Sequence, residues 1–354
     1  MNNLQPEIRR FRAIILAAAI VVFLLIVLGG IVRVTGSTGA CPDWPTCLGK
    51  WTPPQAQPAL INYAHRFFAL LAAPLILAAA ALAWKHFRRL PWLSLPAFIA
   101  LGLLAVQVIL GAMINLAAGG DVWPSVLHLA FSLLVQAGLV ISSVVAFFLT
   151  KKQSIRAETP RLSWSSPFGR LSLVTSAVIF ILLLSGSVVA ASGASAACEG
   201  WPLCTPTAPL GWISLANRGV VALSAVLVLG LLIQAWRTQR TQTAVLVSTT
   251  AAAVLFFAQA LLGAKLVSGY PAYLLGLHQT TAIAAWAALV IQATATGMAR
   301  RTAADEGAEI ALFARRKGGF ALAKDLLMLT KPIVVALLLV TTYAGMVIGM
   351  REWP

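Results

Sequence analysis

Three of the four histidines in this chain stand inside apolar stretches, where an ionisable side chain is costly to place and usually serves a function. They are His65, His128 and His278, and each lies near one end of its stretch. Imidazole is a common axial ligand of heme iron, and two imidazoles at matching depth on facing helices can hold one heme. His65 and His128 fit this arrangement. The structural alternative for each histidine is a hydrogen bond to a neighbouring helix.

Basic residues accompany these histidines near the same ends of the apolar stretches. Arg33, Arg66 and Arg218 are predicted to contact heme propionates, because guanidinium groups pair well with carboxylates. Lys265 is equally well explained by a side chain that reaches towards lipid phosphate. The fourth histidine, His86 in the sequence WKHFRR, is interpreted as an interfacial side chain among cations.

The four cysteines form two pairs with the same spacing, in the sequences CPDWPTC and CEGWPLC. Each pair stands in one loop, so the sequence favours two local disulfides, Cys41–Cys47 and Cys198–Cys204. Free thiols and a zinc site are the alternatives, and zinc is disfavoured because neither loop contains a histidine. Loops that face an oxidising compartment outside the cell would keep such disulfides.

The elements that must position these residues are apolar helices. Of 354 residues, 60% are hydrophobic and only 10% are charged, which is too little charge for a soluble protein surface. The first apolar stretch is too long for a signal peptide and is interpreted as a retained helix. Nine stretches are long enough to cross a bilayer, approximately 13–34, 61–84, 92–116, 124–150, 171–192, 213–236, 243–267, 272–297 and 326–348.

The net charge of +16 follows the pattern of membrane topology. Most basic residues lie in segments on the same side as the N-terminus, whereas the loops 35–60 and 193–212 hold only Lys50. We therefore place the N-terminus in the cytoplasm and the cysteine loops outside the cell membrane. Nucleic-acid binding is disfavoured, because little soluble basic surface remains to neutralise phosphates. Membrane lipid is the expected surrounding partner.

The chain repeats itself in order. GSTGACPDWPTC (36–47) matches GASAACEGWPLC (193–204), and QVILGA (107–112) matches QALLGA (259–264). LHLAFS also matches LHQTTA, and NYAHRF matches SLANRG, which aligns His65 with Asn217. Four helices separate the copies, and an even number preserves their orientation.

The predicted fold is therefore an all-α polytopic membrane protein with two parallel four-helix-bundle repeats. The N-terminal half spans 1–160 and the C-terminal half spans 161–297. A polar, basic cytoplasmic linker (298–325) and an extra, ninth transmembrane helix within 326–354 follow.

Taken together, these motifs resemble the heme A synthase family, membrane enzymes that oxidise the C8 methyl group of heme O to a formyl group. The resemblance covers roughly residues 11–297. In the first half it is carried by GGIVRVTGSTGACPDWPTC, AHRF, LGAMINL and LHLA. In the second half it is carried by CEGWPLC, the dipeptide Asn217-Arg218 and LHQT.

The resemblance implies that each half carries a pair of histidines. His65 and His128 would face the substrate, heme O, and the C-terminal pair would hold a heme b. Asn62 stands where the family often has glutamate, so no catalytic residue is assigned.

A second departure concerns the C-terminal pair, because Asn217 stands where the family has histidine. Asparagine is a poor ligand for heme iron. Either His278 binds a heme with an open or water-filled sixth position, or the C-terminal half is a scaffold without heme. We favour the first of these, because Arg218 and Lys265 still offer partners for propionates.

The last apolar stretch, DLLMLTKPIVVALLLVTTYAGMVIGM (325–350), resembles the opening helix of protoheme IX farnesyltransferase, the enzyme that makes heme O. This resemblance suggests a truncated fusion of two consecutive enzymes. The Asp-rich motifs that bind Mg²⁺ in prenyl transfer are missing, so no farnesyl transfer is expected. A generic anchor helix is the alternative.

The leading hypothesis is a heme A synthase that makes heme A for terminal oxidases. The alternatives are a non-catalytic heme-binding or electron-transfer membrane protein and a protein that hands heme to oxidase assembly. Asn62 favours the alternatives, whereas His65, His128 and the cysteine pairs favour the enzyme. The candidate protein partners are protoheme IX farnesyltransferase and a second copy of this chain.

Overall fold

The computed structural model describes residues 4–44, 46–116, 122–151, 161–198, 200–267 and 272–315. Eight of the helices in this part of the chain are long and apolar enough to cross a membrane. The protein is therefore an all-α polytopic membrane protein, as the sequence predicts. The eight helices are α1 (Leu4–Val34), α2 (Gln57–Leu82), α3 (Pro91–Leu116), α4 (Val122–Lys151), α5 (Pro167–Ala191), α6 (Pro209–Thr238), α7 (Thr243–Leu266) and α8 (Ala272–Ala299).

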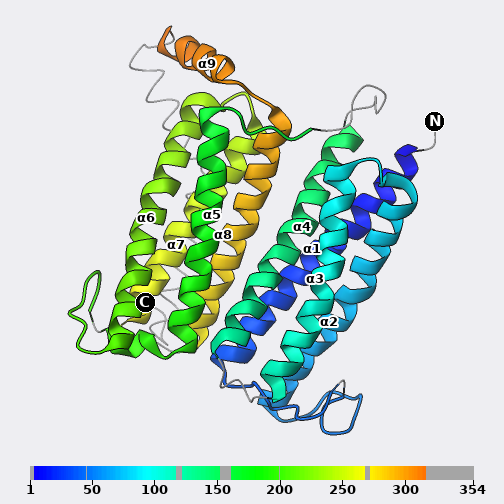
Figure 1. The fold of residues 1–354 in the computed structure, drawn as a ribbon, viewed down its shortest axis with the longest axis vertical. Coiled ribbons are helices and arrows are strands. Elements are labelled where there is room, and N and C mark those ends of the chain that lie inside the picture. Colours follow the sequence, from blue (N-terminus) through cyan, green and yellow to red (C-terminus); the bar gives the residue numbers. More distant parts are fainter. Residues whose placement is uncertain are drawn as a thin grey trace, which may run out of the picture. The chain divides into compact units, whose positions relative to one another are not determined.

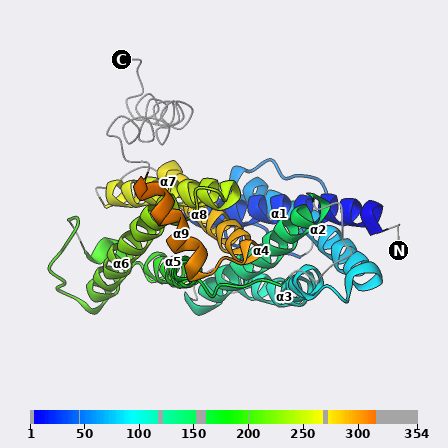
Figure 2. The same cartoon turned by 90° about the horizontal axis from the view of Figure 1, so that it is seen from above.

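Helices α1–α4 form one four-helix bundle, and α5–α8 form a second bundle beside it (Figures 1 and 2). In the first bundle, α1 and α3 each pack against both α2 and α4. Helices α2 and α4 therefore lie diagonally across from each other. In the second bundle, α5 and α7 each pack against both α6 and α8, so α6 and α8 hold the same diagonal positions.

The two bundles meet mainly through α4 and α8, with α1 against α8 and α4 against α5 at the sides. Trp286 of α8 donates a hydrogen bond through Nε1 to the carbonyl oxygen of Leu133 in α4, at 3.1 Å. The α1–α2 and α5–α6 loops, which carry the cysteines, lie at the same end of the bundles (Figure 1). We call this the cysteine end. The two halves thus have the same orientation.

Proline, serine and glycine set several helix boundaries. Helices α2, α5 and α6 each have proline in the first turn, where the missing N–H costs no helical hydrogen bond. Ser166 caps α5 by accepting a hydrogen bond from the Gly169 N–H at 3.0 Å. Beyond the end of α5, Gly193 has a φ of 73°, a left-handed conformation that glycine adopts without strain.

The first eight predicted spans are confirmed, with most starts and ends shifted by a few residues and the start of the first shifted by nine. Helix α1 begins at Leu4, because the polar residues before the apolar span are helical as well. The ninth predicted span, 326–348, lies outside the described residues. The predicted linker contains a helix that the sequence analysis did not assign, α9 (Ala303–Arg315). Asp305 and Glu306 in its first turn interact favourably with the helix dipole.

Candidate heme site

His65 and His128 lie on the diagonal helices α2 and α4 of the first bundle. The Nδ1 atom of each ring is buried and has no hydrogen-bond partner among the described residues. A buried polar atom left without a partner costs roughly 1–3 kcal/mol, so these two rings have unused bonding capacity at the centre of the bundle.

A glycine on a neighbouring helix faces each of these rings, and the one beside His65 is tightly placed. A Cβ atom at Gly29 of α1 would lie 3.1 Å from Cε1 of His65. A Cβ atom at Gly111 of α3 would lie 3.6 Å from Cε1 of His128. The sequence analysis missed Gly29 as a site residue. The sequence feature that could have indicated it is the glycine pair at the start of the motif GGIVRV, of which Gly29 is the first residue.

Gln107 of α3 supports His128 through the backbone. Its Nε2 donates to the carbonyl oxygen of His128 and to Oγ of Ser132, both at 2.8 Å. Ser132 in turn donates to the same carbonyl oxygen at 2.7 Å. The Oε1 atom of Gln107 is buried and has no partner among the described residues. The amide is thus held along α4, away from the imidazole nitrogens of His128.

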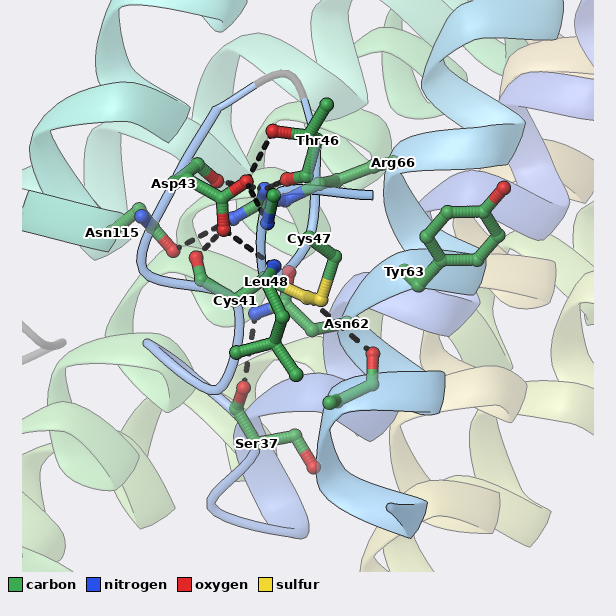
Figure 3. Close-up of a disulfide and its surroundings, with 12 residues drawn as sticks. Ser37, Cys41, Asp43, Thr46, Cys47, Leu48, Asn62, Tyr63, Arg66 and Asn115 are labelled. Carbon is green, nitrogen blue, oxygen red and sulfur yellow. Dashed lines mark hydrogen bonds between the residues drawn. A yellow bond between two sulfur atoms is a disulfide. The ribbon is translucent and has the colours of Figure 1, made fainter. Parts of the chain in front are cut away.

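Arg66, the residue after His65, holds the first cysteine loop (residues 35–56). Its guanidinium donates to the carbonyl oxygens of Cys41, Asp43 and Thr46, and to Oδ1 of Asn115 in α3 at 3.1 Å (Figure 3). Four acceptors therefore engage the guanidinium. The predicted contact between Arg66 and a propionate remains a prediction, and the contacts present give this residue a different role, as the anchor of a loop.

Both predicted disulfides are present, between Cys41 and Cys47 and between Cys198 and Cys204. The alternatives of free thiols and a zinc site are therefore not realised. Among the described ranges, no group of three or more His, Cys, Asp or Glu side chains gathers in a way that could hold a metal ion.

Asp43 organises the tip of the first cysteine loop. Its carboxylate accepts hydrogen bonds from the Thr46 hydroxyl, from the Leu48 N–H at 2.6 Å and from the Gly49 N–H at 3.0 Å. The Thr46 bond is the main reason that the pKa of Asp43 is lowered to about 2, because these donors stabilise the charged form. The loop therefore contains a carboxylate that stays ionised at acidic pH.

Arg218 repeats the role of Arg66 in the second half. It donates to the carbonyl oxygens of Cys198 and Gly200, both at 2.7 Å, and of Pro202 at 3.4 Å. Arg66 and Arg218 thus anchor equivalent loops, each from the second helix of its half. Predicted propionate binding by Arg218 also remains untested.

Arg33, the third predicted propionate partner, joins the two halves. It donates to the hydroxyl and carbonyl oxygens of Ser187 in α5. The residue lies at the end of α1 nearest the first cysteine loop. Its guanidinium is therefore engaged between bundles.

Asn62 is buried in the first turns of α2, with 6% of its surface exposed. Its Nδ2 donates to the carbonyl oxygen of Ser37 at 2.9 Å (Figure 3). A carboxylate at this position has no hydrogen to donate, so an ionised glutamate could not make this hydrogen bond. Asn62 ties α2 to the turn that follows α1.

Comparison with known proteins agrees with this arrangement. The model of the cytochrome oxidase assembly protein family matches residues 12–62 and 59–211, which together span more than half of the chain. The chain belongs to the cytochrome oxidase assembly protein family.

Individual relatives extend the match over both halves of this family member. A heme A synthase of Geobacillus kaustophilus is 28% identical over 262 residues, or 71% of this chain and 80% of the relative. A heme A synthase of Staphylococcus haemolyticus is 26% identical over 259 residues, or 70% of this chain and 82% of the relative.

A protoheme IX farnesyltransferase of Halobacterium salinarum is 35% identical over 135 residues, which is 38% of this chain and 28% of that protein. This similarity agrees with the resemblance expected from the tail. A match of this length is longer than residues 298–354, so it includes residues of the eight-helix part.

The second bundle of this cytochrome oxidase assembly protein uses its polar groups differently from the first. Asn217 of α6 accepts a hydrogen bond through Oδ1 from the Ser185 hydroxyl of α5 at 2.7 Å. His278 of α8 contacts Gln259 of α7 twice, through Nδ1 to the backbone oxygen at 2.9 Å and through Nε2 to the side-chain Nε2 at 3.2 Å.

Glycines mark the equivalent positions in this bundle. A Cβ atom at Gly263 would lie 2.9 Å from Cε1 of His278, as Gly111 faces His128. One at Gly186 would lie 3.9 Å from Oδ1 of Asn217, as Gly29 faces His65. Asn217 therefore lies against the equivalent glycine in the second half of this family member as His65 does in the first half.

Proposed function

We propose that this chain is a heme A synthase, which oxidises the C8 methyl group of heme O to a formyl group. The observation that carries the proposal is the pair His65 and His128, on diagonal helices of one bundle, each with a buried Nδ1 that lacks a partner among the described residues. The relatives named heme A synthase support the same activity.

In this proposal, His65 and His128 bind the iron of the substrate heme O and set its depth in the bundle. Gly29 and Gly111 leave space for the two rings. The apolar helices exclude bulk water. Two successive hydroxylations of the methyl group, each needing an external oxidant that takes two electrons from the carbon and an oxygen atom from water or dioxygen, give a geminal diol that loses water to the aldehyde. Arg33 sits at the cysteine end of α1, where it would limit the opening of the pocket.

The site contains no assigned acid or base. Asn62 donates to the Ser37 carbonyl oxygen and positions α2 against the first cysteine loop. We therefore assign Asn62 a positioning role, with substrate orientation coming from the histidine pair.

The proposed setting is the cell membrane, with the N-terminus in the cytoplasm and the cysteine end outside. Heme O is a farnesylated heme, so an enzyme of the protoheme IX farnesyltransferase class must supply it. Direct contact with that enzyme, or self-association, is proposed as an arrangement that would shorten transfer through the membrane lipid.

Expression with a heme O source tests the activity. Heme extracts should contain heme A with the natural chain and only heme O with His65→Ala or His128→Ala. A second candidate function, a non-catalytic heme-binding membrane protein, is favoured by the amide at Asn62. Heme that copurifies with the chain while no heme A forms would support that function and contradict the enzyme.

A further inference from the structure

We propose that the C-terminal bundle of this chain binds no heme, so that any heme-binding site of the chain lies in the N-terminal half. The family resemblance assigns a heme b to this bundle, and the residues present do not fit it. The inference concerns the half that the proposed activity does not use, so either one can fail without the other.

The first argument is the state of His278. Its Nδ1 lies 2.9 Å from the backbone oxygen of Gln259, and a carbonyl oxygen only accepts, so Nδ1 carries the proton. The lone pair then resides on Nε2, the atom that would coordinate iron. The Nε2 amide of Gln259 donates to it at 3.2 Å. Donation from Nδ1 to a carbonyl oxygen is itself usual for a metal-bound histidine, so the contact that opposes heme binding is the one between the Gln259 amide and Nε2.

The second argument explains why Gln259 turns to His278 while its counterpart does not turn to His128. Gln107 stands at the equivalent position, 152 residues earlier. Its amide is held by Oγ of Ser132 and the His128 carbonyl oxygen. In the repeat LHQTTA, the position of Ser132 is taken by Ala282.

Gln259 and Ala282 line one small pocket, which also has apolar walls from α5, α7 and α8. Ala282 offers no hydroxyl to hold the amide. The amide of Gln259 instead bonds with the imidazole of His278. A heme at His278 would have to displace this amide. Ala282 has no hydroxyl with which the displaced amide could form a hydrogen bond.

The third argument concerns the opposite ligand position. Asn217 faces Gly186, as His65 faces Gly29, so it occupies the place of the lost histidine. Its Oδ1 accepts from Ser185. The residue equivalent to Ser185 in the first half is Leu28, 157 positions earlier. The change from histidine to asparagine is thus accompanied by a hydroxyl that satisfies the new amide oxygen.

Three of the positions that differ between the halves carry this argument, Leu28/Ser185, His65/Asn217 and Ser132/Ala282. The loop anchors do not separate them, because Arg66 and Arg218 make the same kind of contact. The difference lies in the bundle interior, where Asn217 and His278 of the second half each bond with a protein partner.

Hemin titration of the full-length protein in detergent tests the inference, with the ratio of heme to protein and the Soret spectrum as readouts. The natural chain should saturate at one heme per chain. His278→Ala should leave the ratio and the spectrum unchanged, whereas the matched variant His128→Ala should lose most of the bound heme. Saturation at two hemes, or loss of one heme in His278→Ala, would overturn the proposal.

Because His278→Ala removes two contacts and can destabilise the bundle, a gain of binding provides an independent test. The triple variant Ser185→Leu, Asn217→His and Ala282→Ser gives the second half the pattern of the first. It should bind a second heme and add a low-spin bis-histidine spectrum. A triple variant that folds and still saturates at one heme would show that these positions do not prevent binding, against the proposal. A natural chain that binds no heme in either half would contradict the proposed function and agree with this inference.

Discussion

Arg33 of α1 donates to Ser187 of α5 twice, to the hydroxyl oxygen at 3.1 Å and to the carbonyl oxygen at 3.2 Å. Arg33 is one helical turn beyond Gly29, the residue that faces His65. The contact therefore joins the second bundle to the segment of α1 that borders the histidine pair. The C-terminal half contributes to the candidate site by holding α1, although it contributes no ligand to it.

Replacing Arg33 should weaken the whole molecule. Arg33→Met keeps the length of the side chain and removes both donors, so we expect the free energy of unfolding to fall by roughly 1–3 kcal/mol. Ser187→Ala removes one of the two acceptors and should cost about half as much. Thermal unfolding in detergent, followed by tryptophan fluorescence, measures both. Arg10→Met is the control, since Arg10 is exposed and pairs only weakly with Glu7; equal stability of the Arg33 and Arg10 variants would contradict the role of the contact.

A methyl group at Gly29 should impair heme binding. In Gly29→Ala, the new Cβ would lie 3.1 Å from Cε1 of His65, so the ring must shift. We expect hemin affinity to fall roughly tenfold, equivalent to about 1.4 kcal/mol. Gly102→Ala is the matched control, because a Cβ atom there meets nothing within 4 Å. Equal affinity in the two variants would mean that His65 does not bind the iron in the conformation described.

Replacing Asn62 with aspartate should destabilise the protein. Asn62→Asp removes the donor and brings a carboxylate oxygen towards the Ser37 carbonyl oxygen. The expected loss of stability is roughly 1–3 kcal/mol, together with faster hydrogen exchange in the first cysteine loop. Gln55→Glu makes the same amide-to-acid change at an exposed loop residue and should have little effect. If Asn62→Asp exchanges as slowly as the natural chain, Asn62 is not the tie between α2 and the loop.

The first cysteine loop should loosen in strong acid. The pKa of Asp43 is lowered to about 2 in the folded protein from an ordinary value of 3.8, so its contribution is complete above about pH 4. The contribution is lost as the pH falls towards 2, because the protonated carboxyl accepts the loop N–H groups less well. We expect reduction of Cys41–Cys47 by a phosphine, relative to Cys198–Cys204 in the same molecule, to accelerate several-fold in this window.

The variant Asp43→Asn supplies the control for this pH dependence. It should raise the ratio of the two reduction rates at neutral pH and remove its dependence on pH between 4 and 2. A ratio in the natural chain that stays constant down to pH 2 would show that the Asp43 carboxylate does not hold the loop.

Much of this fold follows from features that act over short distances in the sequence. Apolar length predicts the spans, and the repeated motifs predict two bundles in one orientation. The cysteine pairs were predictable because each pair closes within one loop. Helix α9 was missed because a short helix with acidic, alanine-rich composition has the same polarity as a linker.

The partners of the arginines were not predictable, because they depend on where backbone carbonyls point. Nothing in the sequence shows that Arg66 and Arg218 face inward-pointing loop oxygens, or that Arg33 reaches the other bundle. The hydrogen-bond partners of His278 were likewise not predictable. Its two contacts come from Gln259 on a neighbouring helix, and they are visible only once Gln259 is placed beside the ring.

The paired anchors Arg66 and Arg218 have one more consequence. Both halves have the arginine and its disulfide loop, while the residue just before the arginine is histidine in one half and asparagine in the other. The anchoring of the loop is thus separable from the identity of the residue at the ligand position. The two halves can therefore be compared within one molecule. A property that both loops share reflects the scaffold, and a property found in only one bundle interior reflects the residue at its ligand position.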